Sequence, residues 1–235
     1  MTRREASRAM GSRLIAGAEG HLKSAGATTY TYDGDGQRVE KSTGKLYWYG
    51  GTGLPVTETD LAGNNPAEYV LFGGERIARR DSSGHVNYYL ADALGSSRVV
   101  TDPSGNILDD SDFYPFGGER SFVGPTSGNT YKFTGKERDS ETGNDYFTAR
   151  YYGSSLGRFI SPDPLGGDIT IPQSLNRYAY VMNNPTNLID PSGLEPGDPC
   201  ERHPNSVSLA NSKPVCSDSD SSYWATLHVR LALSC

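Results

Sequence analysis

The aspartates of this sequence stand in settings that suit either a turn or acid–base chemistry. The tetrapeptide Asp-Pro-Ser-Gly occurs twice, at residues 102–105 and 190–193. An Asp at the first position of a β-turn accepts hydrogen bonds from backbone N–H groups, and a Gly at the fourth position tolerates the exit geometry. A carboxylate in such a turn can also act as an acid or a base if a second carboxylate lies beside it. The tetrapeptide alone leaves both interpretations open.

The cysteines and nearby histidines suggest other chemistry. Cys200, Cys216 and Cys235 all lie in the last 36 residues, which marks a change of composition near residue 195. They could form one disulfide with a spare thiol, or remain three inert thiols. Together with His203 and His228 they could supply four zinc ligands, but the spacing matches no familiar zinc motif. We therefore expect no metal and no cofactor. The four histidines also suggest no Ser-His-Asp triad.

Composition excludes some partners. The net charge is -6 and the 22 basic residues are spread along the chain, so a nucleic-acid-binding surface is not expected. No apolar run is long enough to span a membrane or to form a signal-peptide core. Residues 1–29 lack the Tyr, Gly and Asp content that follows, and we expect them to form a poorly ordered leader or the ragged start of a piece of a longer protein.

The elements that would position these residues are predicted to be strands. An Asp-x-x-Gly unit recurs, and between the units lie short runs rich in Tyr, Val and Thr, such as "AEYVLF" and "HVNYYLA". Residues 30–106 therefore predict a train of antiparallel β-hairpins, and the fold class is all-β. The units begin at the following residues: Asp33, Asp60, Asp81, Asp92 and Asp102.

The pattern changes at about residue 107. Strand alternation in "YFTARYY" would put Tyr146, Thr148, Arg150 and Tyr152 on one face of a strand. Arg150 would then project from an aromatic strand, where its default role is a stacked or snorkelling side chain. The segment "PQSLNRYAYVMNNP" predicts one short helix, beginning near a Pro and ending at Asn-Asn-Pro.

The segment "YKFTGKERDSETGNDYFTARYYGSSLGRFISPDPLGG", followed by "NRYAYVMNNPTNLIDPSGL", resembles the RHS repeat-associated core domain, and the upstream hairpin units resemble its Tyr-Asp (YD) repeats. The resemblance covers roughly residues 30–194. It implies a hollow β-shell like that of bacterial RHS proteins and of the C subunits of insecticidal toxin complexes. In that family the core domain closes one end of the shell and cuts the chain after a final Asp-Pro-x-Gly-Leu, which leaves a variable C-terminal polypeptide, often a toxin, enclosed.

Carried over to this chain, the resemblance implies an aspartyl-protease-like dyad of Asp163 and Asp190, assisted by Arg150, and a cut between Leu194 and Glu195. The guanidinium could orient a carboxylate or stabilise the developing oxyanion. The chain departs from the family at two places. Gly153 stands where the family usually has Asp, which would loosen the turn after Arg150, and the stretch from Asp163 to Asn176 is longer than usual, which would shift the two aspartates.

We therefore expect a repeat region at 30–106, a self-cleaving core at 107–194 and a variable tail at 195–235. The expected partners are the tail itself, as substrate or cargo, and further RHS repeats or a delivery-system protein. As part of a larger RHS protein the chain would be secreted or displayed at a cell surface. Two alternatives remain: a non-catalytic structural or cell-surface module that binds protein or carbohydrate, in which the aspartates only cap turns, and an inactive gene fragment.

Overall fold

The hairpin turns are built around the predicted aspartates. The computed structural model describes residues 14–16, 21–51 and 53–197. In each Asp-x-x-Gly unit the Asp side chain accepts hydrogen bonds from the N–H groups two and four residues further on, and the Gly adopts a positive φ between 78° and 83°. Left-handed backbone favours Gly because it lacks a Cβ. The predicted turn chemistry is confirmed.

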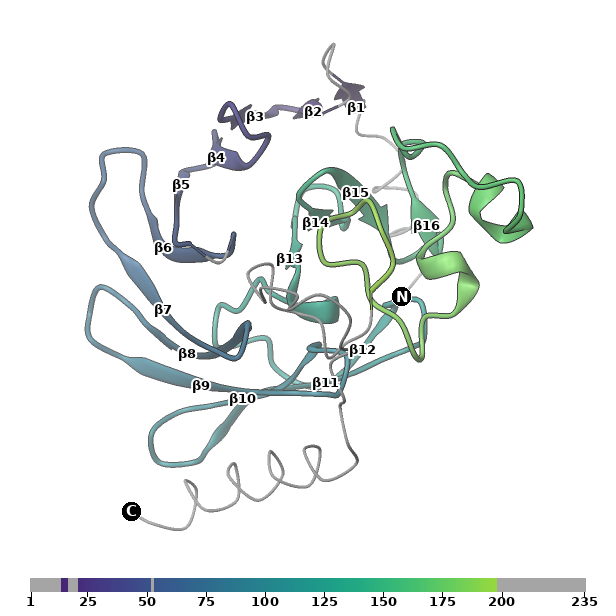
Figure 1. Ribbon diagram of the computed structural model, residues 1–235. Coiled ribbons are helices and arrows are strands. Elements are labelled where there is room, and N and C mark those ends of the chain that lie inside the picture. The colour runs from purple at the N-terminus through teal and green to yellow at the C-terminus, as the bar shows by residue number, and fades with distance from the viewer. Residues whose placement is uncertain (1–13, 17–20, 52, 198–235) are drawn as a thin grey trace.

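Twelve strands form one antiparallel sheet in simple sequence order, and these five turns make five of its connections. In Figure 1 the strands follow an arc, so the sheet has a concave and a convex side. The sheet continues past residue 106 through its last two strands. The strands are β1 (Leu14–Ala16), β2 (Leu22–Ala25), β3 (Thr28–Tyr32), β4 (Arg38–Lys41), β5 (Lys45–Tyr49), β6 (Pro55–Thr59), β7 (Ala67–Phe72), β8 (Glu75–Arg80), β9 (Val86–Ala91), β10 (Ser97–Thr101), β11 (Ile107–Phe113) and β12 (Glu119–Val123).

A smaller four-stranded sheet lies on the concave side of the arc (Figure 1). A short 3-10 helix, η1 (Phe133–Gly135), precedes it. Its strands are β13 (Glu137–Arg138), β14 (Asp145–Phe147), β15 (Arg150–Gly153) and β16 (Arg158–Phe159). One face of this sheet packs in an aromatic core consisting of Phe133, Phe147, Tyr152, Phe159, Tyr180 and Val181, all at most 2% exposed. The architecture is all-β, as predicted from the sequence.

The segment "YFTARYY" is a hairpin, so the prediction of one continuous strand is wrong. Thr148 has a φ of 62°, which turns the chain back at the first residue after β14 ends. Tyr146 consequently pairs with Tyr151, and Phe147 pairs with Arg150. The hairpin buries aromatic rings on both faces, because Tyr146 and Tyr151 pack with Leu22 and its neighbours on the large sheet.

The predicted short helix is divided into two 3-10 helices, η2 (Pro172–Leu175) and η3 (Val181–Asn183). Met182 inside the second has a φ of 53°, which is incompatible with a continuing right-handed helix. The residues between them pair with β16 instead: the N–H of Phe159 donates to the carbonyl of Tyr178. In the part of the chain that the structure describes, none of the helices is long and apolar enough to cross a membrane.

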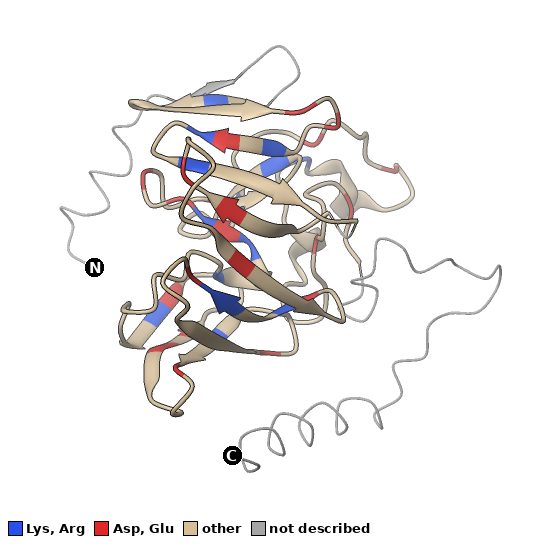
Figure 2. Ribbon diagram, turned by 90° about the vertical axis from the view of Figure 1, so that its left-hand side faces the viewer, with Lys and Arg blue, Asp and Glu red and all other residues tan. Residues whose placement is uncertain are grey.

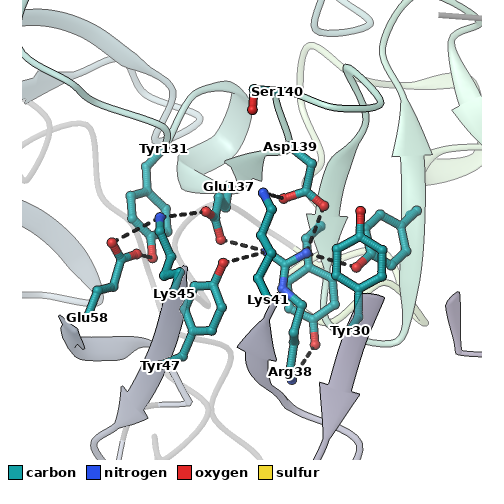
Figure 3. A network of polar contacts seen from close by, with 12 residues as sticks. Tyr30, Arg38, Lys41, Lys45, Tyr47, Glu58, Tyr131, Glu137, Asp139 and Ser140 are labelled. Carbon is teal, nitrogen blue, oxygen red and sulfur yellow. Dashed lines mark hydrogen bonds and ion pairs between the residues drawn. The ribbon is translucent and has the colours of Figure 1, made fainter. Parts of the chain in front are cut away.

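Buried ion pairs join the small sheet to the concave face of the large one (Figure 3). Arg38 on β4 is fully buried, and its guanidinium lies 2.6 Å from Glu137 and 2.7 Å from Asp139. Lys41 lies 2.9 Å from Asp139, and Lys45 lies 2.8 Å from Glu137. Buried charges are tolerated only when they are paired. These ion pairs therefore favour one position of the small sheet relative to the large one.

Basic and acidic residues are interspersed on the strands that face the viewer in Figure 2. Charges of both signs therefore occur on the same strands of the large sheet. This distribution matches the spread of basic residues along the sequence.

Candidate active site

Arg150 is held in place by three groups around its guanidinium. It lies on β15 and is 4% exposed. Its Nε donates to the carbonyl of Gly193, and its Nη1 donates to the carbonyl of Arg177 over 3.1 Å. Its Cζ lies 3.6 Å from the centroid of the Phe159 ring. These contacts hold the guanidinium in place without any contribution from the aspartates.

The remaining nitrogen of Arg150 faces both predicted aspartates. Nη2 lies 2.9 Å from Oδ2 of Asp163 and 3.5 Å from Oδ2 of Asp190. The structure thus brings all three sequence-predicted residues together. The two carboxylates meet through the guanidinium, and the distance between their Oδ2 atoms is at most the sum of those two distances.

Backbone pairing explains the position of Asp163. Its N–H donates to the carbonyl of Arg177 over 2.8 Å, and Nε of Arg177 donates back to its carbonyl over 2.7 Å. The Arg177 carbonyl also accepts the hydrogen bond from Arg150. Arg177 therefore links Asp163 to the arginine, a positioning role that the sequence pattern did not single out.

Asp190 caps a turn that contains the predicted scissile residue. Its Oδ1 accepts hydrogen bonds from the N–H groups of Ser192, Gly193 and Leu194, over 3.2, 2.7 and 3.1 Å. Gly193 has a φ of 81°, and a Cβ there would meet the Phe147 carbonyl oxygen. Only glycine fits this close approach.

Two further contacts hold this turn against the small sheet. The Ala149 N–H donates to the carbonyl of Ser192 over 3.0 Å, and Lys136 Nζ donates to the carbonyl of Pro191 over 2.5 Å. The turn is also closed from outside, because Ile189 and Gly197 exchange two backbone hydrogen bonds of 3.0 and 2.7 Å. The Leu194–Glu195 bond lies inside this closed loop.

Burial gives Asp190 a different acidity from that of its counterpart in the first Asp-Pro-Ser-Gly copy. Asp190 is 2% exposed, and burial raises its pKa despite the backbone hydrogen bonds and the nearby Arg150. Asp102 caps a similar turn, with its Oδ1 2.8 Å from the Ser104 nitrogen, but hydrogen bonds from Asn106 lower its pKa. Burial also disfavours the charged form of Arg150 and so lowers its pKa. The same turn chemistry thus occurs in two electrostatic environments.

A cavity of about 170 Å³ opens beside these residues. Arg150, Asp163 and Asp190 line it, and so do Leu194 and Glu195. Leu194 is half-buried, whereas Glu195 is exposed. The arrangement brings two carboxylates, one guanidinium and the predicted scissile bond to one small space.

Neither departure from the family pattern separates these groups. Gly153 is buried on β15, and its carbonyl accepts hydrogen bonds from the N–H groups of Leu156 and Gly157, both over 2.9 Å, which closes the turn. The long stretch after Asp163 forms a loop around η2, while Asp163 itself stays beside Arg150.

The cysteine and histidine set of the tail, Cys200, His203, Cys216, His228 and Cys235, lies outside the described residues. Within the residues that the structure describes, no group of three or more His, Cys, Asp or Glu side chains could hold a metal ion.

Comparisons with known proteins add to this geometry. The chain is 37% identical over 120 residues to toxin subunit YenC1 of Yersinia entomophaga, which covers 49% of this chain and 12% of that protein. It is 32% identical over 171 residues to the tRNA nuclease WapA of Bacillus subtilis, covering 70% of this chain and 7% of that protein. The crystal structure of TcdB2-TccC3 matches with a TM-score of 0.64 and 27% identity, over 78% of this chain and 10% of that one.

The chain is an RHS-associated protein. No family model matches it. The chain spans between 7% and 12% of the length of these relatives, which include a toxin subunit and a tRNA nuclease.

Proposed function

We propose that this RHS-associated chain cuts itself between Leu194 and Glu195 with Asp163, Asp190 and Arg150. The observation that carries the proposal is that one guanidinium contacts both aspartates at a cavity lined by the residues on either side of that bond. The substrate is the chain's own tail, residues 195–235. The enzyme is thus an intramolecular aspartyl-type protease with a single turnover.

Asp163 is the general base. Its side chain is 16% exposed, the more accessible of the two carboxylates, and it lies on the cavity wall. The ionised carboxylate takes a proton from water, and the water oxygen forms a bond to the carbonyl carbon of Leu194. Arg150 orients the Asp163 carboxylate through a charge-assisted contact of 2.9 Å.

Asp190 is the general acid. Burial raises its pKa, which favours the protonated carboxyl. Oδ1 is occupied by three backbone N–H groups, whereas Oδ2 lies 3.5 Å from Arg150 Nη2, long for a charge-assisted hydrogen bond. A proton on Oδ2 passes to the nitrogen of Glu195 as the C–N bond breaks. This leaves an amine on Glu195 and a carboxylic acid on Leu194, which then gives its proton to the Asp190 carboxylate.

The closed turn supplies the positioning. The Leu194 N–H is bound to Asp190, and residues 189 and 197 are paired, so the scissile bond is already in the site. Intramolecular reactions of this kind can reach effective molarities of about 10⁵ M or more. A site with modest catalytic power is therefore sufficient for one turnover.

The biological setting follows from the relatives. Their names include a toxin subunit and a tRNA nuclease, and the matching structure is a TcdB2-TccC3 chain. We infer that residues 30–106 belong to a repeat shell, that residues 107–194 form its self-cleaving core, and that the released tail acts as cargo in toxin delivery or contact-dependent competition. Further RHS repeats or a delivery protein would complete the shell.

One observation favours the alternative of a purely structural module. Asp190 caps its turn with backbone hydrogen bonds much as Asp102 does. Among the described hydrogen bonds and ion pairs, no second carboxylate contacts Asp102, so this kind of cap also occurs without a carboxylate pair. The intact mass of the expressed chain, compared with Asp163→Asn and Asp190→Asn, separates the two functions. Self-cleavage predicts a break after Leu194 in the parent alone.

A further inference from the structure

A second cavity of about 390 Å³ lies between the large sheet and the back of the Asp190 turn. Arg76 and Tyr89 of the concave sheet face contribute to it from one side, and Thr134, Lys136 and Pro191 contribute from the other. The proposed self-cleavage uses none of these side chains as acid or base. The cavity adjoins the proposed active site, because Asp190 lines both.

Arg76 lines this cavity, and one edge of its guanidinium is unused. The residue is 9% exposed, and its Cζ lies 3.4 Å from the centroid of the Tyr131 ring and 4.7 Å from that of Tyr69. Nη1 donates to the carbonyl of Gly135 over 3.4 Å. Nε and Nη2 have no hydrogen-bond partner among the described residues. These two nitrogens form one edge of the planar fork, the edge that binds two oxygens side by side.

One neutral group of the lining is in the same condition. The hydroxyl of Tyr89 is buried without a hydrogen-bond partner in the described part of the chain. Unpaired buried polar groups are costly, and two such side chains around one cavity indicate a missing polar ligand.

We propose that this cavity binds a carboxylate, with its two oxygens on Nε and Nη2 of Arg76. The lining also contains apolar groups, Leu54, Ala91 and Ile189 among them, so the ligand carries an apolar body. Glu75 also lines the cavity, and its carboxylate disfavours a doubly charged phosphate more than a singly charged carboxylate. The proposal stands independently of self-cleavage.

The probe is benzoate, with benzamide as a neutral control of the same shape. The 15N resonance of Arg76 Nε in the full-length chain should shift with benzoate and remain unchanged with benzamide, and calorimetry should give an affinity for benzoate about tenfold or more above that for benzamide. Inorganic phosphate should bind more weakly than benzoate. Equal affinities for benzoate and benzamide, without a shift at Arg76, would overturn a site for free carboxylates.

Variants distinguish the paired N–H groups of the Arg76 guanidinium from its positive charge alone. Arg76→Lys keeps the charge but loses the two-nitrogen edge, so the affinity for benzoate should fall about tenfold, whereas Arg80→Lys on the same strand, with an exposed side chain, should leave it unchanged. If Arg76→Lys unfolds, Tyr89→Phe serves instead, since it removes only a hydroxyl without a partner. That variant should weaken benzoate binding several-fold and leave the melting temperature unchanged or higher.

The carboxylate could also come from the chain itself, because the tail contains Asp198, Glu201, Asp218, Asp220 and the C-terminus. In that case the Nε resonance of Arg76 in the unliganded full-length chain should already have the position of a carboxylate-bound arginine. It should move to the position of an unbound arginine when those four side chains are replaced by Asn or Gln and the C-terminus is amidated. A resonance that responds neither to benzoate nor to these replacements would contradict both sources and the proposal itself.

Discussion

Arg150 Nη2 lies 2.9 Å from Oδ2 of Asp163, although the two residues lie on β15 and on the loop that follows β16. The same nitrogen reaches Asp190 at 3.5 Å. One buried guanidinium thus joins three chain segments, and the third of them contains the Leu194–Glu195 bond. The two aspartates are arranged around this arginine.

Replacing Arg150 by Lys should slow self-cleavage at least about tenfold, because an ammonium cannot contact Asp163, the Gly193 carbonyl and the Arg177 carbonyl at once. The rate is measured as the growth of the cut mass after dilution of denatured, uncut chain into refolding buffer. Arg158→Lys, an exposed arginine of β16, is the matched control. An Arg150→Lys variant that folds and cuts at the parent rate would contradict the role assigned to the guanidinium.

The two glycines that end the Asp-Pro-Ser-Gly copies should respond differently to a methyl group. Gly105 and Gly193 have φ angles of 83° and 81°, so each Ala variant bears a strain of about 1 kcal/mol. A Cβ at Gly105 meets nothing within 4 Å, whereas at Gly193 it meets Phe147 and Arg150. Gly193→Ala should therefore unfold at clearly lower denaturant and stop cleavage, while Gly105→Ala keeps cutting. Equal losses of stability in the two variants would argue against this packing.

Cleavage should slow as the pH rises. Burial raises the pKa of Asp190, and its proposed role requires the protonated form, which disappears as the pH rises through that raised pKa. Refolding and cutting at a series of pH values, with circular dichroism as the control for folding, measures the profile. A rate that increases steadily with pH would be incompatible with Asp190 as the acid.

The buried network of Figure 3 predicts a specific pH dependence of stability. Burial raises the pKa of Glu137, but Lys45, Arg38 and Lys41 outweigh it and lower the value from 4.5 to about 2. The ionised carboxylate therefore stabilises the folded state above pH 4.5, and this stabilisation is lost as the pH falls toward 2. Glu137→Gln should lower the free energy of unfolding at neutral pH by about 3 kcal/mol.

Denaturant titrations of parent and variant at several pH values test this directly. The difference between the two free energies should shrink as the pH falls through 4.5. Glu40→Gln, on the half-buried middle of β4, is the control and should change little. A pH-independent difference between parent and Glu137→Gln would contradict the lowered pKa.

The hairpin turns could be predicted from sequence because their chemistry is local: an Asp and the backbone N–H groups within four residues of it. The path of "YFTARYY" could not, because Thr148 adopts a positive φ that only the burial of rings on both faces of the hairpin explains. Here tertiary packing overrides a regular alternation.

The buried network was missed for a related reason. In β4 the fully buried residues are the two charged ends, Arg38 and Lys41, whereas Val39 is only half-buried, the reverse of what hydrophobicity predicts. Their partners Glu137 and Asp139 lie about a hundred residues further on. The acidic run "KERDSETGND" was a possible signal, but nothing local pairs it with β4. For the active site, the residues came from the family resemblance, and the bridging by Arg150 came from the fold.

The most direct test is the intact mass of the full-length chain after folding, alongside Asp163→Asn and Asp190→Asn. Self-cleavage predicts that the parent separates into residues 1–194 and 195–235, while both variants keep the full mass with an unchanged circular dichroism spectrum. A folded parent that keeps its full mass, or an Asn variant that cuts after Leu194 as fast as the parent, would contradict the account.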